Sequence, residues 1–538
     1  MKDQEKFRNI LFYTILTSGL TFIYGHLLSN DPFLVYDDIM VVGNVEKINS
    51  FASYLQALQK GHIPDIQPVR DFFTFLNYFL LRHTGYGFFH ALNMLTFVGM
   101  IMGLRKGINL IFKFEKLAID CLLLLIAFSP LYISSVAWLS SRKHLLSATF
   151  IVWASVHLIR FIQGSLKSWI WFTLFFALSI LSQPINILWP CFASLALLFY
   201  GKRKDLLILL PSFGVAAVVG ILNLKYYSST YLWISGGYSK YANVLDSGIG
   251  ASYLVYGRYF LQVLVPYWTS IGEYGYQSWQ NILGLSLIAP YYYIFYKLTD
   301  LRKPILVFTA FTLGIFPVIW KITHRFGTDT YLVSASIPLL IGLFLIVRAS
   351  GIKRKIIAPL LALLICGEVA ISKEKAKVWD DTFSVFKQAY ETEKSFMNQY
   401  LYLSWMMTQS GFQDVFNVAA DLYEKYPDRI GAQNLLARII AVAEISVDEK
   451  IKLFSRFNFS SRTAGIMMAS FEQERGNYNN AYSILDGIMS SHSSLNGVGF
   501  GCNMISELWT TSCQKSGRSN CDRLKDIVTK KCDDSINL

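Results

Sequence analysis

The chain has 538 residues, of which 53% are hydrophobic and only 16% are charged. Soluble domains usually carry about 25% charged residues, so these values argue against a single soluble globule. The net charge of +13 arises in residues 1–372, which contain 30 Lys and Arg against 16 Asp and Glu, whereas residues 373–538 contain 19 against 20. Because this basicity flanks apolar segments, it indicates a polytopic domain in a lipid bilayer and no nucleic-acid partner.

Long apolar runs in residues 1–372 have about the length that crosses a membrane. The first run, 10–28, follows three basic residues and lacks a cleavage site of small residues, so we predict a retained span and not a signal peptide. Further spans are predicted at 86–104, 117–138, 144–161, 168–182, 185–200, 205–224, 281–297, 304–320, 330–348 and 356–371. We therefore expect an all-α membrane domain of about eleven spans.

Basic residues indicate the orientation of these spans, because short cytoplasmic loops are enriched in Lys and Arg. Such residues cluster in the loops near 105–116, 160–167, 202–204, 297–303 and 348–355. With eleven spans, all five loops lie on the side of the N-terminus. This predicts a bacterial inner-membrane protein with a cytoplasmic N-terminus and a periplasmic C-terminal domain. The alternative is an endoplasmic reticulum membrane with a lumenal C-terminus.

One further segment, 253–266, is also apolar. If it were a span, the later basic loops would lie on the opposite side of the membrane. We therefore predict a re-entrant or interface-lying helix there.

Residues 373–490 have the apolar spacing of helices. Two segments, 400–428 and 464–489, each contain two helical runs that turn at Gly411 and Gly476, 65 positions apart. This separation is close to two periods of about 34 residues, which predicts a tetratricopeptide-like repeat with a degenerate middle repeat. The concave face of such a stack commonly binds peptide. The alternative is an irregular helical bundle without a binding role.

Four cysteines lie close together in the tail, residues 491–538: Cys502, Cys513, Cys521 and Cys532. An even number at short spacing in an exported segment predicts two disulfides, with three possible pairings. Zinc binding or free thiols are the alternatives. No C-x2-C pair is present and no histidine is nearer than His492, so we expect no metal site.

Candidate catalytic residues occur in the predicted external loops. Asp37 and Asp38 follow the first span, where a carboxylate can act as general base toward a hydroxyl; the alternative is a solvated acidic turn or a helix cap. Arg70 begins a Phe-rich segment, 67–83, which we expect to lie along the membrane interface. His90 and Asn93, one turn apart in the second span, are expected to form interhelical hydrogen bonds.

Two further external turns are cationic. Arg142, Lys143 and His144 lie between two predicted spans, where Arg and Lys can bind a lipid-linked phosphate; the alternative is that they only flank the membrane. Arg325, with Asp329 and Tyr331 after it, belongs to a charged loop between later spans. Positive charge on the outer side runs against the usual bias and favours a functional role.

Several of these segments resemble one family, the transmembrane and tetratricopeptide-repeat O-mannosyltransferases and their bacterial relatives. The similar stretches are the Asp-Asp pair after the first span, residues 68–93, and most specifically residues 136–150 (VAWLSSRKHLLSATF). In two other family stretches this chain differs: Gln183 and Pro184 replace a Lys-Glu pair, and Asp329-Thr330-Tyr331 replaces Glu-Arg-Tyr.

The resemblance implies a GT-C type glycosyltransferase that uses a polyprenyl-phosphate sugar, with mannose as the expected sugar. Asp37 or Asp38 would be the base, and Arg142, Lys143, Arg70 and Arg325 would bind the donor phosphate. His90, Asn93, His144, Asp329 and Tyr331 would support them. The acceptor would be a Ser or Thr of an exported polypeptide held by the repeats, and transfer would invert the sugar.

The resemblance implies no tightly bound cofactor and leaves a divalent metal open. Two rival hypotheses stay open. A non-catalytic scaffold that recruits exported partners would explain the replaced motif residues. A transporter or flippase of lipid-linked glycan would need ionisable groups near the bilayer midplane, whereas these groups concentrate in loops.

Overall fold

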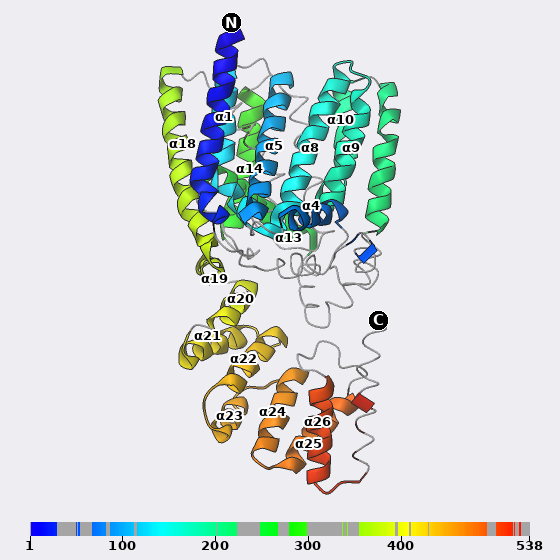
Figure 1. Ribbon diagram of the computed structural model, residues 1–538, viewed down its shortest axis with the longest axis vertical. Coiled ribbons are helices and arrows are strands. Elements are labelled where there is room, and N and C mark those ends of the chain that lie inside the picture. Colours follow the sequence, from blue (N-terminus) through cyan, green and yellow to red (C-terminus); the bar gives the residue numbers. More distant parts are fainter. Residues whose placement is uncertain are drawn as a thin grey trace. The chain divides into compact units, whose positions relative to one another are not determined.

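The computed structural model describes two groups of helices (Figure 1). The described residues are 2–29, 50, 52–53, 67–81, 87–111, 116–201, 203–222, 248–266, 279–298, 336, 340, 342, 354–392, 396–407, 410–428, 430–491, 502–519, 521, 524 and 527–528. All regular secondary structure in these ranges is helical, which confirms the all-α prediction. The described residues up to Thr392 form one compact unit, and those from Phe396 form the second.

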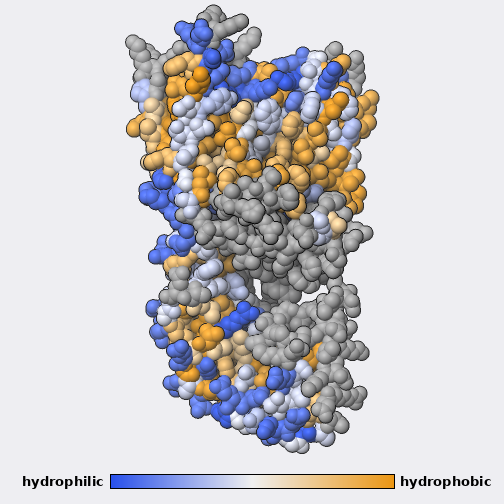
Figure 2. Space-filling view, viewed as in Figure 1, coloured by the Kyte–Doolittle hydropathy of each residue, from blue (hydrophilic) through white to orange (hydrophobic). Residues whose placement is uncertain are grey.

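The first unit contains helices at several of the predicted spans, together with other helices and short helical turns. They are α1 (Lys2–Tyr24), η1 (Gly25–Leu28), α4 (Pro68–Leu81), α5 (Gly87–Ile111), α6 (Lys116–Phe128), η2 (Pro130–Tyr132), α7 (Ile133–Ala137), η3 (Leu139–Ser141), α8 (Arg142–Ile162), α9 (Ser168–Ser182), η4 (Pro184–Asn186), α10 (Trp189–Tyr200), η5 (Arg203–Leu209), α13 (Gly248–Leu264), α14 (Trp279–Leu298), α18 (Arg354–Lys377), η10 (Val378–Asp380) and α19 (Thr382–Thr392). The long helices have hydrophobic sides, and hydrophilic residues gather at the end where α1 begins (Figure 2).

Four helices of the described part are long and apolar enough to cross a membrane, or five if the bent pair formed by α6 and the segment after it is one span. This finding agrees with a membrane protein. The number of eleven stays a prediction, and the predicted spans 304–320 and 330–348 lie almost entirely outside the described residues.

The predicted straight span at 117–138 is broken. The chain bends by 49° between α6 and the segment 130–137. Ser129 is extended there, and Pro130, which has no backbone N–H, begins the next turn. The carbonyl of Phe128 accepts a hydrogen bond of 2.6 Å from Ser372 of α18. A side chain from α18 thus satisfies a carbonyl that the break leaves without its helical partner.

Glycines permit close packing of α5 against α8. A methyl group added at Gly103 would lie 2.8 Å from Val152, and one at Gly107 would lie 3.4 Å from Val156. Trp153 donates a hydrogen bond of 3.1 Å to the carbonyl of Gly99. Small residues spaced by four are common where membrane helices cross closely, so this spacing positions α8 on α5.

Helices α1 and α18 run in the same direction. His26 Nε2, just after α1, lies 3.1 Å from the carbonyl oxygen of Ala376, near the end of α18. The two helices lie side by side along their length (Figure 1). If both cross a membrane, the N-terminus of α1 and the C-terminus of α18 lie on opposite sides, which requires an odd number of crossings, as the distribution of basic residues predicts.

Most of the segment 253–266 lies in the helix α13, which packs closely on α14 where Gly257 meets Gly284.

The second unit is a stack of helices. Its elements are α20 (Phe396–Met406), α21 (Phe412–Lys425), α22 (Ile430–Val442), α23 (Val447–Phe454), α24 (Arg462–Glu474), α25 (Tyr478–Ser491) and α26 (Cys502–Lys515). Each helix contacts the next, and α20, α22, α24 and α26 also contact one another in that order. Helices α22 and α23 occupy the place of the degenerate repeat, with a capping box at Ser446 and Glu449 at their turn. The tetratricopeptide assignment itself stays a prediction.

The cysteine-rich tail, which includes α26, packs against α25. Cys513 and Cys521 form a disulfide. Both are buried in a hydrophobic cluster with Leu485 of α25 and Trp509 of α26. One of the predicted bonds is therefore confirmed, and it leaves Cys502 and Cys532 as the predicted second pair. Cys532 and the side chain of Cys502 lie outside the described residues.

Candidate functional site

Six of the predicted site residues come together at one end of the first unit. They are Arg70, His90, Asn93, Arg142, Lys143 and His144, and all of them are buried. They lie on α4, on the first turns of α5 and on the first turn of α8. The other predicted residues, Asp37, Asp38, Arg325, Asp329 and Tyr331, lie outside the described residues.

Arg142 joins the start of α8 to the start of α5. Its Nε donates to Asn93 Oδ1 at 2.8 Å, and one terminal nitrogen donates to the Phe89 carbonyl at 2.7 Å. The guanidinium carbon also lies 5.3 Å from the centre of the Phe89 ring. Asn93 Nδ2 donates to the carbonyl of Val136 at 3.0 Å, so the predicted interhelical bonding of Asn93 is confirmed. Arg142 therefore has a structural role at this end, beside its predicted role toward phosphate.

Arg70 is held by its neighbours on α4. Its Nε and one terminal nitrogen each lie 2.6 Å from Asp71 Oδ1, and its other terminal nitrogen donates to Gln67 Oε1 at 3.1 Å. Gln67 Nε2 in turn donates to Gln183 Oε1, at the end of α9, at 2.6 Å. Helix α4 lies across the end of the long helices (Figure 1). Its amphipathic face explains this position, because Arg70 is 1% exposed whereas Phe72, two residues later, is 58% exposed.

A second polar network ties α8 to α9 beneath this end. Ser147 donates to the carbonyl of Gln183 at 3.1 Å, and Asn186 Nδ2 donates to Ser147 Oγ and Ser179 Oγ at 2.9 and 3.0 Å. The sequence reasoning missed Gln67, Asp71, Gln183 and this network. Of these residues, only Asp71 could have been identified from the sequence. It follows Arg70 at the start of an apolar helix, and buried charges of opposite sign require each other as partners.

Buried polar atoms at this end lack partners within the described part of the chain. They are His90 Nδ1, Ser135 Oγ and Ser141 Oγ. Most buried polar groups in proteins are hydrogen-bonded, so such atoms require an explanation. Ser141 directly precedes α8, whose first backbone N–H groups point toward the same end. Together these groups offer hydrogen-bond donors to a ligand.

Several charged side chains are buried at this end. Arg70, Arg142 and Lys143 are buried cations, and Asp71 is the buried carboxylate beside them. The N-terminus of α8 adds partial positive charge. Buried charges are stable only where they are paired or hydrogen-bonded. Arg and Lys side chains are also the groups that bind phosphate in proteins. Within the described residues, no group of three or more His, Cys, Asp or Glu side chains could hold a metal ion.

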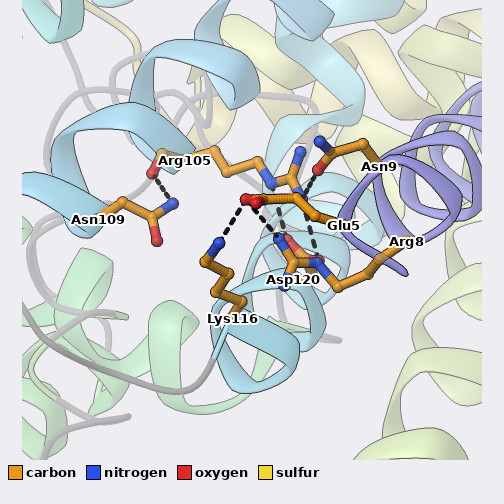
Figure 3. Close-up of polar contacts among 7 residues, drawn as sticks. All are labelled: Glu5, Arg8, Asn9, Arg105, Asn109, Lys116 and Asp120. Atoms are coloured by element: carbon orange, nitrogen blue, oxygen red, sulfur yellow. Dashed lines mark hydrogen bonds and ion pairs between the residues drawn. The ribbon is translucent and has the colours of Figure 1, made fainter. Parts of the chain in front are cut away.

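At the opposite end of the unit, Arg8, Arg105 and Lys116 are paired with carboxylates (Figure 3). Asp120 accepts from Arg105 at 2.8 and 3.0 Å and lies 3.3 Å from Arg8 Nε. Glu5 pairs with Lys116. These contacts join α1, α5 and α6, and they explain the polar end of α1 structurally.

No family model, no characterised protein and no solved structure matches the chain. The function is therefore inferred from the residues of the chain and from the geometry described above. A fold class alone does not identify an activity, so the buried cationic end of the first unit has the greatest weight.

Proposed function

We propose that the protein is an integral-membrane glycosyltransferase of the GT-C type. It moves a sugar, mannose as the expected one, from a polyprenyl-phosphate donor to a hydroxyl of an exported polypeptide. The supporting observation is the cluster of buried cations, Arg70, Arg142 and Lys143, at one end of a group of apolar helices. A polyprenyl phosphate has an apolar tail that suits the helices and an anionic head that suits such an end.

The proposed mechanism uses residues of two kinds. Asp37 or Asp38 accepts the proton of the acceptor hydroxyl, and the oxygen attacks the anomeric carbon from the face opposite the phosphate. The bond between that carbon and the phosphate oxygen breaks, and polyprenyl phosphate leaves. Arg142 and Lys143, with Arg70 and Arg325, stabilise the negative charge that develops on the leaving phosphate. The configuration at the anomeric carbon is inverted.

Turnover by Asp37→Asn and Asp38→Asn variants tests this proposal. A general base contributes about 10²- to 10⁴-fold, so one of the two variants should lose at least about a hundredfold in turnover while it still binds donor. Sugar transfer is measured in membranes supplied with polyprenyl-phosphate mannose. Asp31→Asn, in the same segment of the chain, is the control and should retain turnover. Full transfer by both variants would rule out the proposed base.

The proposal includes an orientation in which the cationic end faces the outside. The N-terminus is then cytoplasmic and the second unit is exported, into the periplasm or, as the alternative, into the lumen of the endoplasmic reticulum. Parallel α1 and α18 support an odd number of spans. An alkaline phosphatase fused after Lys375 should be active, and one fused after Lys204 should be inactive. The opposite pattern would reverse the orientation and place the cationic end in the cytoplasm.

A non-catalytic membrane scaffold is the second candidate. The stacked helix pairs of the second unit favour it, because such stacks present surfaces that bind polypeptides. In that case the unmodified protein would transfer no sugar with any polyprenyl-phosphate donor, and it would still retain an exported partner. The proposed glycosyltransferase instead loses transfer, but not partner binding, in the aspartate variants.

A further inference from the structure

A stripe of four residues runs along one face of α8, from near the middle of the helix toward the end away from the cationic end. Phe150, Trp153, His157 and Arg160 are spaced by three, four and three positions, and all are partly exposed. At this spacing the side chains share one helix face. We call these four residues the α8 stripe. Helix α5 packs on one side of α8 and α9 packs on the other.

Basic side chains gather at the far end of the α8 stripe. Lys106 of α5 places its ammonium 5.5 Å from the centre of the Trp153 ring. His157 lies within electrostatic range of both Lys106 and Arg160. Within the described residues, neither Lys106 nor Arg160 forms an ion pair. Their charges therefore differ from those of Arg8, Arg105 and Lys116 at the same end of the unit, each of which contacts a carboxylate.

Aromatic rings continue the α8 stripe toward the middle of the helix. The His157 ring stacks on Phe175 of α9 with a centroid distance of 5.6 Å and lies 6.1 Å from Trp171. Phe175 also lies 6.2 Å from Phe150 and 6.3 Å from Trp153. Apolar side chains beside these rings are exposed, with Trp171 at 48% and Leu174 at 44%. The surface is thus cationic at its end and aromatic and apolar below it.

We propose that the α8 stripe, with Lys106, binds one anionic phospholipid. Its phosphate pairs with Lys106 and Arg160, and an acyl chain lies along the rings of Trp153, Phe150 and Phe175. This order of chemistry along the helix matches an amphiphile with an anionic head. Unpaired cations between membrane helices, near the end of the helices, suit the head group of an anionic lipid. A zwitterionic lipid would add a cation to the same place and bind more weakly.

This lipid site is separate from the proposed donor site. Arg142 begins α8 and Arg160 is 18 positions later, which corresponds to about 27 Å along a helix. That length is close to the thickness of the hydrocarbon core, so the two head groups would belong to opposite leaflets. The inference does not depend on the glycosyltransferase proposal.

Lipid binding by the full-length purified protein tests the proposal. Native mass spectrometry would count bound phosphatidylglycerol and phosphatidylcholine after equal exposure to both lipids. The unmodified protein should retain at least about fivefold more phosphatidylglycerol, since one ion pair accounts for about 1 kcal/mol. The double variant Lys106→Gln, Arg160→Gln should lose this preference. The control, Lys6→Gln with Lys116→Gln, removes the same charge from the same end on α1 and α6 and should keep it.

Three results would overturn the proposal. One is equal retention of the two lipids by the unmodified protein, a measurement that does not depend on the folding of any variant. Another is an unchanged preference in the Lys106, Arg160 variant. The third is an equal loss in the control variant, which would indicate a general effect of net charge and no specific site.

Discussion

The two ends of the first unit hold their charged side chains in different ways. At the end where α1 begins, Arg8, Arg105 and Lys116 each contact a carboxylate of Asp120 or Glu5 (Figure 3). At the other end, the hydrogen bonds that the described residues give Arg142 go to a side-chain amide and a backbone carbonyl. The comparison is therefore between ion pairs at one end and hydrogen bonds from Arg142 to neutral oxygens at the other.

Arg142→Ala is expected to have the largest effect of the variants that test this comparison. It removes two hydrogen bonds from a charged donor and leaves Asn93 Oδ1 without a donor, so the free energy of unfolding should fall by at least about 3 kcal/mol. Thermal unfolding in detergent measures this loss, and binding of polyprenyl phosphate measures the ligand role.

Arg142→Lys separates the two roles of Arg142. Lysine keeps the charge but cannot donate to Asn93 and Phe89 in the same way. If the charge serves an anion, this variant should recover donor binding more than it recovers stability. Equal recovery of both, or of neither, would make Arg142 a structural residue alone.

Asp120→Asn should have a smaller effect, of a different kind. It leaves Arg105 without its carboxylate, and loss of one partner of a buried ion pair costs about 3 kcal/mol. The unfolding temperature should fall, but the remaining folded protein should bind donor with unchanged affinity. A loss of donor affinity would contradict the assignment of this end to stability.

Gln183→Leu should have the smallest effect on stability, about 1–2 kcal/mol, because it leaves one buried amide of Gln67 without its acceptor. The matched control at the opposite end is Gln163→Leu. Gln163 donates to the carbonyl of Leu110 at an exposed position, so its loss should change stability by less than about 0.5 kcal/mol. Thermal unfolding compares the two variants, and an equal cost would contradict a buried network at the cationic end.

The sequence predicted the helices better than their connections. Apolar length is a local property, so the helices near 86–104, 144–161 and 168–182 could be placed from composition. The break at Ser129 and Pro130 was missed because the apolar run continues through it. The repeat at α22 and α23 was weak in sequence, yet its Ser446 and Glu449 carry the signature of a helix start.

The candidate site could be predicted only in part. Arg142 and Lys143 were identified because cations on the expected outer side of a membrane protein are unusual. The amide network around Arg70 could not be identified, because Gln67 and Gln183 are 116 positions apart and meet only after α4 packs across the end of α9. Amide side chains have no charge, so composition does not reveal them.

The pairing of α1 with α18 sets an order for assembly during synthesis. Asp120, which contacts Arg8, is made 112 residues after it, so α6 can hold α1 early. The contact between His26 and Ala376 joins residues 350 positions apart. At 5–20 residues per second, the ribosome needs about 20–70 s to supply this second partner. Until then, any face of α1 that α18 later covers stays in contact with lipid or with the insertion machinery. The arrival of α18 therefore completes the packing around α1 before the second unit is made.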